Sequence, residues 1–361
     1  MIRHNLSSLA LSGTLLCGCG GHHEESQLPS SQPIEPIAGD AVFVVNGGDG
    51  SISVIDAETN ALAGTIQLEH ADYPHHVYLS DDGKRLLVAV PGVDLSAGHG
   101  GDDGGHGGHG DGHGGAEPGE HSILLLDSSD GATEVARALA EMNHNAIFSP
   151  DGMEVWTSQM SSPGSVLVLD AATLETRATI PVGDAPAEVT FSPDGSHAFV
   201  ANTGSDSVSV IDVGSKTVVE TIQVGDTPVG AWPGSDGVMY VDNEAGKSLT
   251  AIDATTRDVV RTHELGFTPA MAAVTPAGEL WVTATDTGKV VIYSAADGTV
   301  QGEIATGAGA HAMAFSGDGQ TAYVTNQLAN TVSVIDVVGR SVIATIEVGA
   351  KPNGIVFRPA L

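Results

Sequence analysis

The sequence predicts an all-β protein, a seven-bladed β-propeller with four antiparallel strands in each blade. Short runs rich in Val, Ile, Phe and Thr alternate with turns of Gly, Pro, Asp and Asn, which is typical of strands joined by tight turns. The runs recur at intervals of 41 to 43 residues along most of the chain. The two ends of the repeating region match different strands of one repeat, which indicates a closed ring.

Residues 186–225 show the repeat in its plainest form, with the four runs EVTF, AFVAN, SVSVID and VVETIQV. Between the first two runs, the segment SPDG places Pro and Asp at the centre of a type I turn. The Gly that follows supplies the left-handed residue that closes a hairpin. A single sheet of this kind leaves both faces uncovered, so neighbouring copies must cover them.

The third run gives the spacing of the repeats. The residue that closes it recurs at Asp56, Asp127, Asp170, Asp212, Asp253, Ser294 and Asp336. One interval is much longer than the others, because it contains a His- and Gly-rich insertion. Residues 41–46 match the second run of the repeat and residues 352–359 match the first. We therefore expect the last strand to complete the first blade, which hides the sheet edges.

The N-terminal segment has the build of an export signal over residues 1–18, with a basic start and a short apolar stretch. Its end, LCGC, resembles a bacterial lipobox with Cys19 as the lipidated residue, and plain secretion is the alternative. We expect residues 19–40 to form a flexible polar tether and residues 41–361 to form the propeller. These features predict a periplasmic protein anchored by lipid to a bacterial membrane, and they favour the outer membrane over the inner one.

The composition excludes one class of partner. The formal net charge is -32, and phosphate binding needs a basic surface, so we expect no nucleic acid. Solubility or a salty habitat explains this acidity, and a surface that attracts cations is the alternative. No other stretch approaches the ~20 apolar residues of a membrane span, so the lipid would be the only membrane contact. We expect a monomer.

The insertion at residues 97–121 is too poor in apolar residues to pack, and we expect it to be disordered without a ligand. It contains the candidate metal ligands His99, His106, His109, His113 and His121, with Asp102, Asp103 and Asp111 as additional ones. Imidazoles and carboxylates on Gly spacers suit Zn, Cu or Ni, which predicts a metal-binding arm. A neutral low-complexity loop is the alternative.

A second candidate site appears when the first runs are aligned on their turn Gly. The same position then holds His75, His144 and His311 in three of the seven repeats, and His76 and Glu188 stand one place further on. The first strand of each blade lines the channel of a propeller, so these side chains converge at one rim. Three imidazoles there would bind zinc or copper, with zinc favoured, and Glu188 is a possible additional ligand. Separate histidines bonded to backbone are the alternative.

Two further expectations follow from the same alignment. The loop between second and third strands opens on the rim that carries the histidines, so the insertion should hang over the mouth of the channel. Trp156, Trp232 and Trp281 occupy strand positions, and we expect all three to pack between blades.

The repeats resemble those of the YVTN-repeat propellers, a family that includes YncE-like exported proteins. The resemblance rests on YVTN at residues 323–326, partial copies at 199–202 and 240–243, the VSVID runs and the TIxVG endings. It covers residues 41–361 apart from the insertion and implies the fold rather than one activity. The His-rich segment and Pro74-His75-His76 are also similar to exported zinc-chaperone propellers. That similarity implies a periplasmic metal-binding protein or transporter component as partner.

The sequence contains no HExxH, GxSxG or CxxCH motif and no phosphate-binding Gly loop, so it predicts a protein that is not an enzyme. The first hypothesis is a lipid-anchored propeller that binds a divalent transition metal as a chaperone or buffer. The second is a protein- or surface-binding scaffold in which the His tract is incidental. The third is a metal- or quinone-dependent enzyme with its site in the channel.

Overall fold

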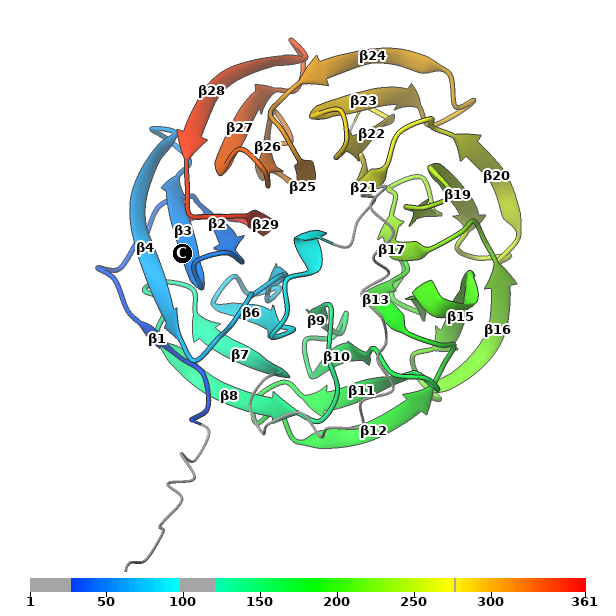
Figure 1. Ribbon diagram of the computed structural model, residues 1–361, viewed down its shortest axis with the longest axis horizontal. Helices are drawn as coiled ribbons and strands as arrows, with labels where there is room; N and C mark the ends of the chain where they lie inside the picture. The colour runs from blue at the N-terminus through cyan, green and yellow to red at the C-terminus, as the bar shows by residue number, and fades with distance from the viewer. Residues whose placement is uncertain (1–26, 98–120, 276) are drawn as a thin grey trace, which may run out of the picture.

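A computed structural model describes residues 27–97, 121–275 and 277–361, and these form a ring of seven antiparallel sheets around a central channel (Figure 1). Six sheets have four strands, and the first has a fifth. The predicted seven-bladed propeller is therefore confirmed. No helix among the described residues is long and apolar enough to cross a membrane.

The blades are numbered here in chain order. The first contains β1 (Ser30–Gln32), β2 (Ala41–Asn46), β3 (Ser51–Asp56), β4 (Ala61–Glu69) and β29 (Pro352–Arg358). The second contains β5 (Val77–Leu79), β6 (Arg85–Val90), β7 (His121–Asp127) and β8 (Thr133–Leu139), with the 3-10 helix η1 (Leu95–Ala97) after β6. The third contains β9 (Ala146–Phe148), β10 (Glu154–Gln159), β11 (Ser165–Asp170) and β12 (Thr176–Pro181).

The other four blades follow the same plan. The fourth contains β13 (Pro186–Phe191), β14 (His197–Asn202), η2 (Thr203–Ser205), β15 (Ser207–Asp212) and β16 (Thr217–Gln223). The fifth contains β17 (Pro228–Pro233), β18 (Val238–Asn243), β19 (Ser248–Asp253) and β20 (Val259–Glu264). The sixth contains β21 (Pro269–Val274), β22 (Glu279–Ala284), β23 (Lys289–Ser294) and β24 (Val300–Ala305). The seventh contains β25 (Ala310–Phe315), β26 (Thr321–Asn326), β27 (Thr331–Asp336) and β28 (Ser341–Glu347).

The ring closes where the sequence predicts, because β29 pairs antiparallel with β2 and completes the first blade. The buried side chain of Arg358 holds this junction together. Its guanidinium donates hydrogen bonds to the carbonyl oxygens of Ser128 at 2.7 Å, Ile37 at 2.7 Å and Gly39 at 2.6 Å. One side chain therefore joins the last strand, the second blade and the segment that precedes β2.

Part of the expected tether is instead bound to the propeller, which corrects the sequence-based prediction for residues 30–39. The strand β1 pairs with β4, and Ile34 and Ile37 pack against the core between the first two blades. The physical reason is that β4 would otherwise be an open edge strand, and the two isoleucines bury apolar surface when they cover it. Cys19 and the proposed export signal lie outside the described residues.

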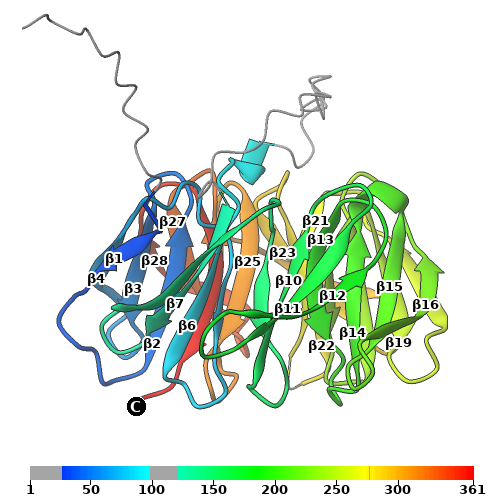
Figure 2. The same ribbon diagram turned by 90° about the horizontal axis from the view of Figure 1, so that it is seen from below.

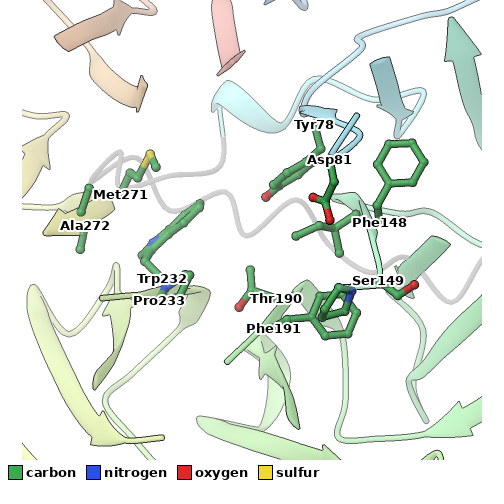
Figure 3. A pocket seen from close by; sticks show the side chains of 13 residues that line it. Tyr78, Asp81, Phe148, Ser149, Thr190, Phe191, Trp232, Pro233, Met271 and Ala272 are labelled. Carbon is green, nitrogen blue, oxygen red and sulfur yellow. The ribbon is translucent and has the colours of Figure 1, made fainter. Parts of the chain in front are cut away.

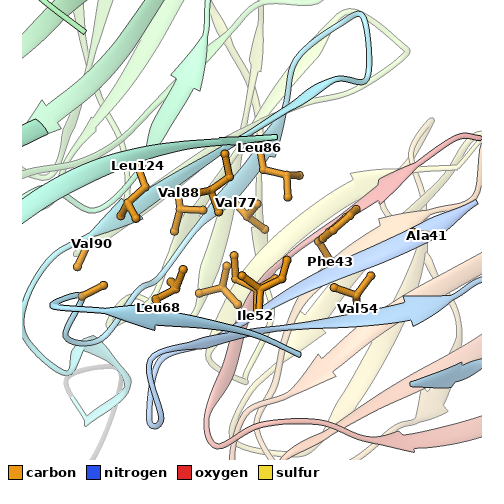
Figure 4. Close-up of a cluster of buried hydrophobic side chains, with 14 residues drawn as sticks. Ala41, Phe43, Ile52, Val54, Leu68, Val77, Leu86, Val88, Val90 and Leu124 are labelled. Atoms are coloured by element: carbon orange, nitrogen blue, oxygen red, sulfur yellow. The ribbon is translucent and has the colours of Figure 1, made fainter. Parts of the chain in front are cut away.

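The core lies between neighbouring blades, where side chains from facing sheets interdigitate. Figure 4 shows Phe43, Ile52 and Val54 of the first blade against Leu86 and Leu124 of the second. All five are no more than 1% exposed. Since each sheet covers its neighbour, the ring needs no other hydrophobic core.

The tryptophans do not all behave alike. Trp156 and Trp281 are fully buried between blades, edge-on to Phe191 at 5.4 Å and to Phe315 at 5.8 Å respectively. Trp232 instead lies on an innermost strand, β17, and lines a cavity in the channel. Trp232 also belongs to the buried core between the fifth and sixth blades, so the expectation of blade packing holds for all three tryptophans, and Trp232 has the channel as a second neighbour.

The innermost strands β5, β9, β13, β17, β21, β25 and β29 surround the channel, as predicted (Figure 1). The amide of His75 donates to the carbonyl of Ala89 at 2.9 Å, so the segment before β5 lies beside the end of β6. The chain that leaves β6 reaches η1 at that end of the ring, and the C-terminus lies at the opposite end (Figure 2). The described start of the insertion therefore lies on the rim that carries the histidines.

Candidate metal centre in the central channel

Three buried histidines meet at one rim of the channel. His75 and His76 precede β5, and His144 precedes β9 in the next blade. One ligand nitrogen from each lies within 4.8 Å of the other two. The ring of His75 is 4.4 Å from the ring of His144 and 4.6 Å from that of His76, measured between centroids. Two imidazoles from one blade and one from its neighbour therefore share a single location.

The local backbone of the second and third blades differs from that of the later blades. In blades four to seven the innermost strand begins at the position equivalent to Pro74 and is six residues long, as in β13 and β17. In the second and third blades it begins three residues later, and β5 and β9 have only three residues each. Residues 74–76 and 143–145 are thus outside the regular ladder, which leaves them at the rim next to the channel.

A buried carboxylate supports two of the three imidazoles. Glu188, on β13, is 1% exposed, and its Oε1 lies 3.1 Å from Nε2 of His76 and 3.4 Å from Nδ1 of His144. Burial alone would raise the pKa of Glu188, but the charge of His76 and the hydrogen bonds from both histidines outweigh it and lower that pKa to about 2. Glu188 is therefore an anion that orients the rings, and its Oε2 has no hydrogen-bond partner among the described residues.

His311 and Asn353 lie next to this cluster. The ring of His311, on β25, is 6.2 Å from that of His75, and the side-chain amide of Asn353, on β29, contacts Nδ1 of His75. The structure thus brings His75, His76 and His144 together, with Glu188 against two of them and His311 beside them. Sequence alignment had placed His75, His144 and His311 at equivalent positions, but His76 and not His311 is the third member of the tight group.

The histidines of the insertion are a separate case. His99, His106, His109 and His113, with Asp102, Asp103 and Asp111, lie outside the described residues. His121 begins β7, and its Nδ1 is 2.6 Å from the carbonyl oxygen of Pro91. Asp94, three residues before the insertion, forms an ion pair with Lys351, so the segment that leads into the insertion is attached to the loop before β29.

The channel continues past the histidines as two adjoining cavities. A cavity of 300 Å³ is lined by His76, Val77, Met313 and Phe315, among others. A second cavity of 390 Å³ lies toward the ends of the innermost strands, and Figure 3 shows the side chains that surround it. Tyr78, Trp232 and Met271 line both cavities. The buried cluster can therefore be reached through a mostly apolar passage.

Sequence reasoning did not identify a second buried carboxyl group, Asp242 on β18. Its Oδ1 accepts hydrogen bonds from Nε1 of Trp232 at 2.7 Å and from the amide of Gly230 at 3.0 Å. Burial, followed by the negative charges of Glu244 and Glu188, raises the pKa of Asp242 well above its ordinary value despite these hydrogen bonds. The signal was present in the sequence, because YVDN at residues 240–243 has Asp where YVTN at 323–326 has Thr.

The comparisons with known proteins identify the family. The sequence model described as outer membrane protein assembly factor BamB matches residues 142–352, which is more than half of the chain. The chain belongs to this propeller family. The narrower resemblance to YVTN-repeat and YncE-like proteins stays a prediction. No curated protein matches the sequence.

Several solved structures share the fold. The periplasmic gluconolactonase PpgL of Pseudomonas aeruginosa has a TM-score of 0.70 and 16% identity, and the match covers 89% of this chain and 99% of that one. Hydrazine synthase of Kuenenia stuttgartiensis has a TM-score of 0.62 and 20% identity, with 80% and 90% of the two chains covered. The dihydro-heme d1 dehydrogenase NirN, in complex with DHE, has a TM-score of 0.60 and 17% identity, with 88% and 68% covered.

These neighbours overturn the expectation that the chain is not an enzyme. That expectation depended on missing linear motifs, and the neighbours include a gluconolactonase, a hydrazine synthase and a dehydrogenase with the same fold. In a propeller, the residues of a site come from equivalent positions of separate blades, so no short motif needs to connect them. The absence of such motifs therefore excludes no activity.

Proposed function

We propose that the channel binds a divalent transition metal through His75, His76 and His144, and that zinc is favoured over copper. The observation that carries this proposal is the convergence of three buried imidazoles whose ligand atoms lie within 4.8 Å of one another. Neutral imidazole is a common ligand of both metals, and the nearby Glu188 balances their charge.

The residues fit such an ion. A tetrahedral zinc ion with bonds of about 2.1 Å holds its ligand atoms roughly 3.4 Å apart. Small rotations of the three side chains close the remaining gap. Glu188 has the role of the carboxylate that accepts a hydrogen bond from a ligating imidazole, which fixes the orientation of the ring and strengthens it as a ligand.

The number of ligands favours a reactive site over a structural one. Structural zinc sites have four protein ligands, whereas catalytic sites have three and leave a position for water or substrate. The cavity of 300 Å³ beside His76 provides space at that position. When bound, the metal would polarise a carbonyl group or lower the pKa of a water molecule. We therefore propose a metal-dependent enzyme whose substrate enters through the channel.

A role in metal storage or delivery is a second candidate, supported by the His-rich composition of residues 97–121. In this role the protein would be exported and anchored to the membrane by a lipid on Cys19. Its partner would be a periplasmic metal-binding protein or a transporter component. The burial of His75, His76 and His144 favours slow exchange of the metal, which suits a resident ion better than a transported one. Rapid loss of the channel metal to a chelator would support delivery instead.

The test is zinc titration of the purified protein against a chromogenic chelator. A variant without residues 98–120 should still bind about one zinc ion tightly, and His76→Ala or His144→Ala in that background should bind none. His197→Ala is the matched control, because this histidine lies on β14, outside the cluster, and its side chain hydrogen-bonds Ser196. Glu188→Gln should weaken binding by about 10- to 100-fold. Equal affinity in all of these variants would refute the site.

A protein-binding scaffold is the remaining candidate, favoured by the description of the family as an assembly factor. A partner that binds equally well to the wild type and to His144→Ala, with a chelator present, would support a scaffold function that is independent of the metal.

A further inference from the structure

We infer that the cavity of 390 Å³ at the opposite end of the channel binds an organic ammonium ion with an apolar body. The inference names the class of substrate for the proposed function, but its evidence comes from the cavity and not from the histidines. The volume lies within the range of small-molecule sites. Two features of its lining identify the ligand: aromatic rings and a single carboxylate.

Four of the thirteen residues that line the cavity are aromatic: Tyr78, Phe148, Phe191 and Trp232. Phe148 and Phe191 end β9 and β13, and Trp232 lies one residue before the end of β17. Each is 7–8% exposed, because its ring also packs in the core between blades. Figure 3 shows Trp232 and Tyr78 on opposite sides of the cavity, with their rings toward its centre. Aromatic faces carry a negative electrostatic potential, so they attract cations as well as apolar groups. Met271 adds a polarisable thioether to the same wall.

The charged groups exclude an anionic ligand. Asp81, in the exposed turn after β5, is the one charged residue among those lining this cavity. No lysine or arginine lines either cavity among the described residues. The whole chain has a net charge of -32, which adds to the negative potential at the mouth. An acid, a phosphate or a sulfate would therefore find no positive partner in this passage.

The position of Asp81 also fixes the orientation of the ligand. This carboxylate lies at the open rim, and Tyr78, Trp232 and Met271 connect the cavity to the inner one that contains His76. A cationic head would remain beside Asp81 and the aromatic rings, while its apolar body extends toward the histidines. Such a molecule buries apolar surface along the passage and keeps its charge paired at the mouth.

The probes are 4-phenylbutyltrimethylammonium, 4-phenylbutanol and 4-phenylbutanoate, measured by isothermal titration calorimetry on the full chain. The protein is treated with chelator and the salt is kept at physiological strength, so a failure of zinc binding leaves the result unaffected. We expect the ammonium ion to bind at least about tenfold more tightly than the alcohol, and the carboxylate not to bind. Equal binding of the three compounds would overturn the inference.

Two variants separate the cavity from general attraction by an acidic surface. Asp81→Asn should weaken binding of the ammonium ion by about fivefold or more and leave the alcohol unchanged. Asp72→Asn makes the same change in charge at an exposed position outside both cavities and should have no effect. Phe191→Leu should weaken the ammonium ion more than the alcohol. Equal losses in Asp81→Asn and Asp72→Asn would show that only the overall charge matters, which also contradicts the inference.

Discussion

Gly354 offers a direct test of how the metal centre is supported. It lies on β29, where its amide donates to the carbonyl of His75 at 2.8 Å. A Cβ added there would meet the Cα of His76 at 2.7 Å and the carbonyl oxygen of His75 at 2.8 Å. Ordinary contacts begin at 3.4 Å, and both obstacles are backbone atoms. The Gly354→Ala protein must therefore separate β29 from residues 75–76 by roughly half an ångström.

Overpacking of this kind costs about 1–3 kcal/mol of the free energy of unfolding. Urea unfolding followed by circular dichroism, with chelator present, measures it without the metal. Zinc titration of the same variant should also show weaker binding, because His75 and His76 move with the backbone. The control is Gly302→Ala, another strand glycine, whose added Cβ meets only an atom of Arg340 at 3.7 Å. That variant should be unchanged or slightly more stable.

The result that would refute this reasoning is a Gly354→Ala protein as stable as Gly302→Ala. It would mean that β29 and the segment before β5 are not in close contact. A loss of stability with unchanged zinc affinity would be informative in another way. It would show that the three imidazoles keep their positions when the neighbouring strand shifts, and hence that Glu188 and not the backbone of β29 fixes them.

Three further predictions concern the propeller and its second buried carboxyl group. Arg358→Met removes three charge-assisted hydrogen bonds at the ring closure and should lower the free energy of unfolding by about 3–5 kcal/mol. The control Arg340→Met, on the surface, should lower it far less. Equal losses of stability in urea titrations would contradict this prediction. Trp156→Ala should cost about 3–5 kcal/mol, measured in the same way, because the side chain is fully buried between blades. Burial raises the pKa of Asp242 in the folded protein, so the stability that its neutral form contributes is complete below the ordinary pKa of the carboxyl group and is lost as the pH rises through the folded-state pKa. Asp242→Asn should therefore be more stable than the wild type by about 1 kcal/mol or more at pH 8 and similar to it at pH 4. An equal difference at both pH values would refute the assignment.

The blade pattern could be predicted from sequence because strands and turns depend on local residue types. Runs like VSVID and turns like SPDG recur with variations along the repeats, so a misleading residue in one copy is corrected by comparison with the others. The attachment of residues 30–39 could not be predicted in this way. Those residues have no counterpart in the other repeats, and their place depends on Ile34 and Ile37 meeting a surface formed by distant parts of the chain.

The candidate site was predictable in part for the same reason. Equivalent positions in the repeats placed His75, His144 and His311 at one rim, but alignment does not give the rotation of a side chain about the axis. The structure groups His76 with the first two although alignment places it one position further on, and Glu188, at the position equivalent to His76 on the regular strand β13, reaches the same cluster. Asp242 was missed because a single substitution inside a regular strand is read as variation of the repeat.

The position of Asp242 nevertheless has a clear physical meaning. At the equivalent place in the next two blades, the hydroxyl of Thr283 donates to the carbonyl of His311 at 2.6 Å, and that of Thr325 donates to the carbonyl of Asn353 at 3.0 Å. In these two blades the position holds a donor toward the following blade, whereas Val45, Ala89 and Ala201 occupy it in the first, second and fourth blades. A protonated carboxyl group is also a donor, which is consistent with the raised pKa of Asp242, but Oδ2 of Asp242 has no hydrogen-bond partner among the described residues.

The side chains that line the channel differ between two groups of neighbouring blades. Going round the ring from the seventh blade to the fourth, the side chains at the rim are those of His311, Asn353, His75, His144 and Glu188. The fifth and sixth blades instead contribute Trp232 and Met271 to the apolar wall. A ring built from identical blades would present the same chemistry in every direction. Because the polar residues occupy consecutive blades, a metal on one side faces an apolar surface on the other, and a ligand that touches both can bind in only one orientation.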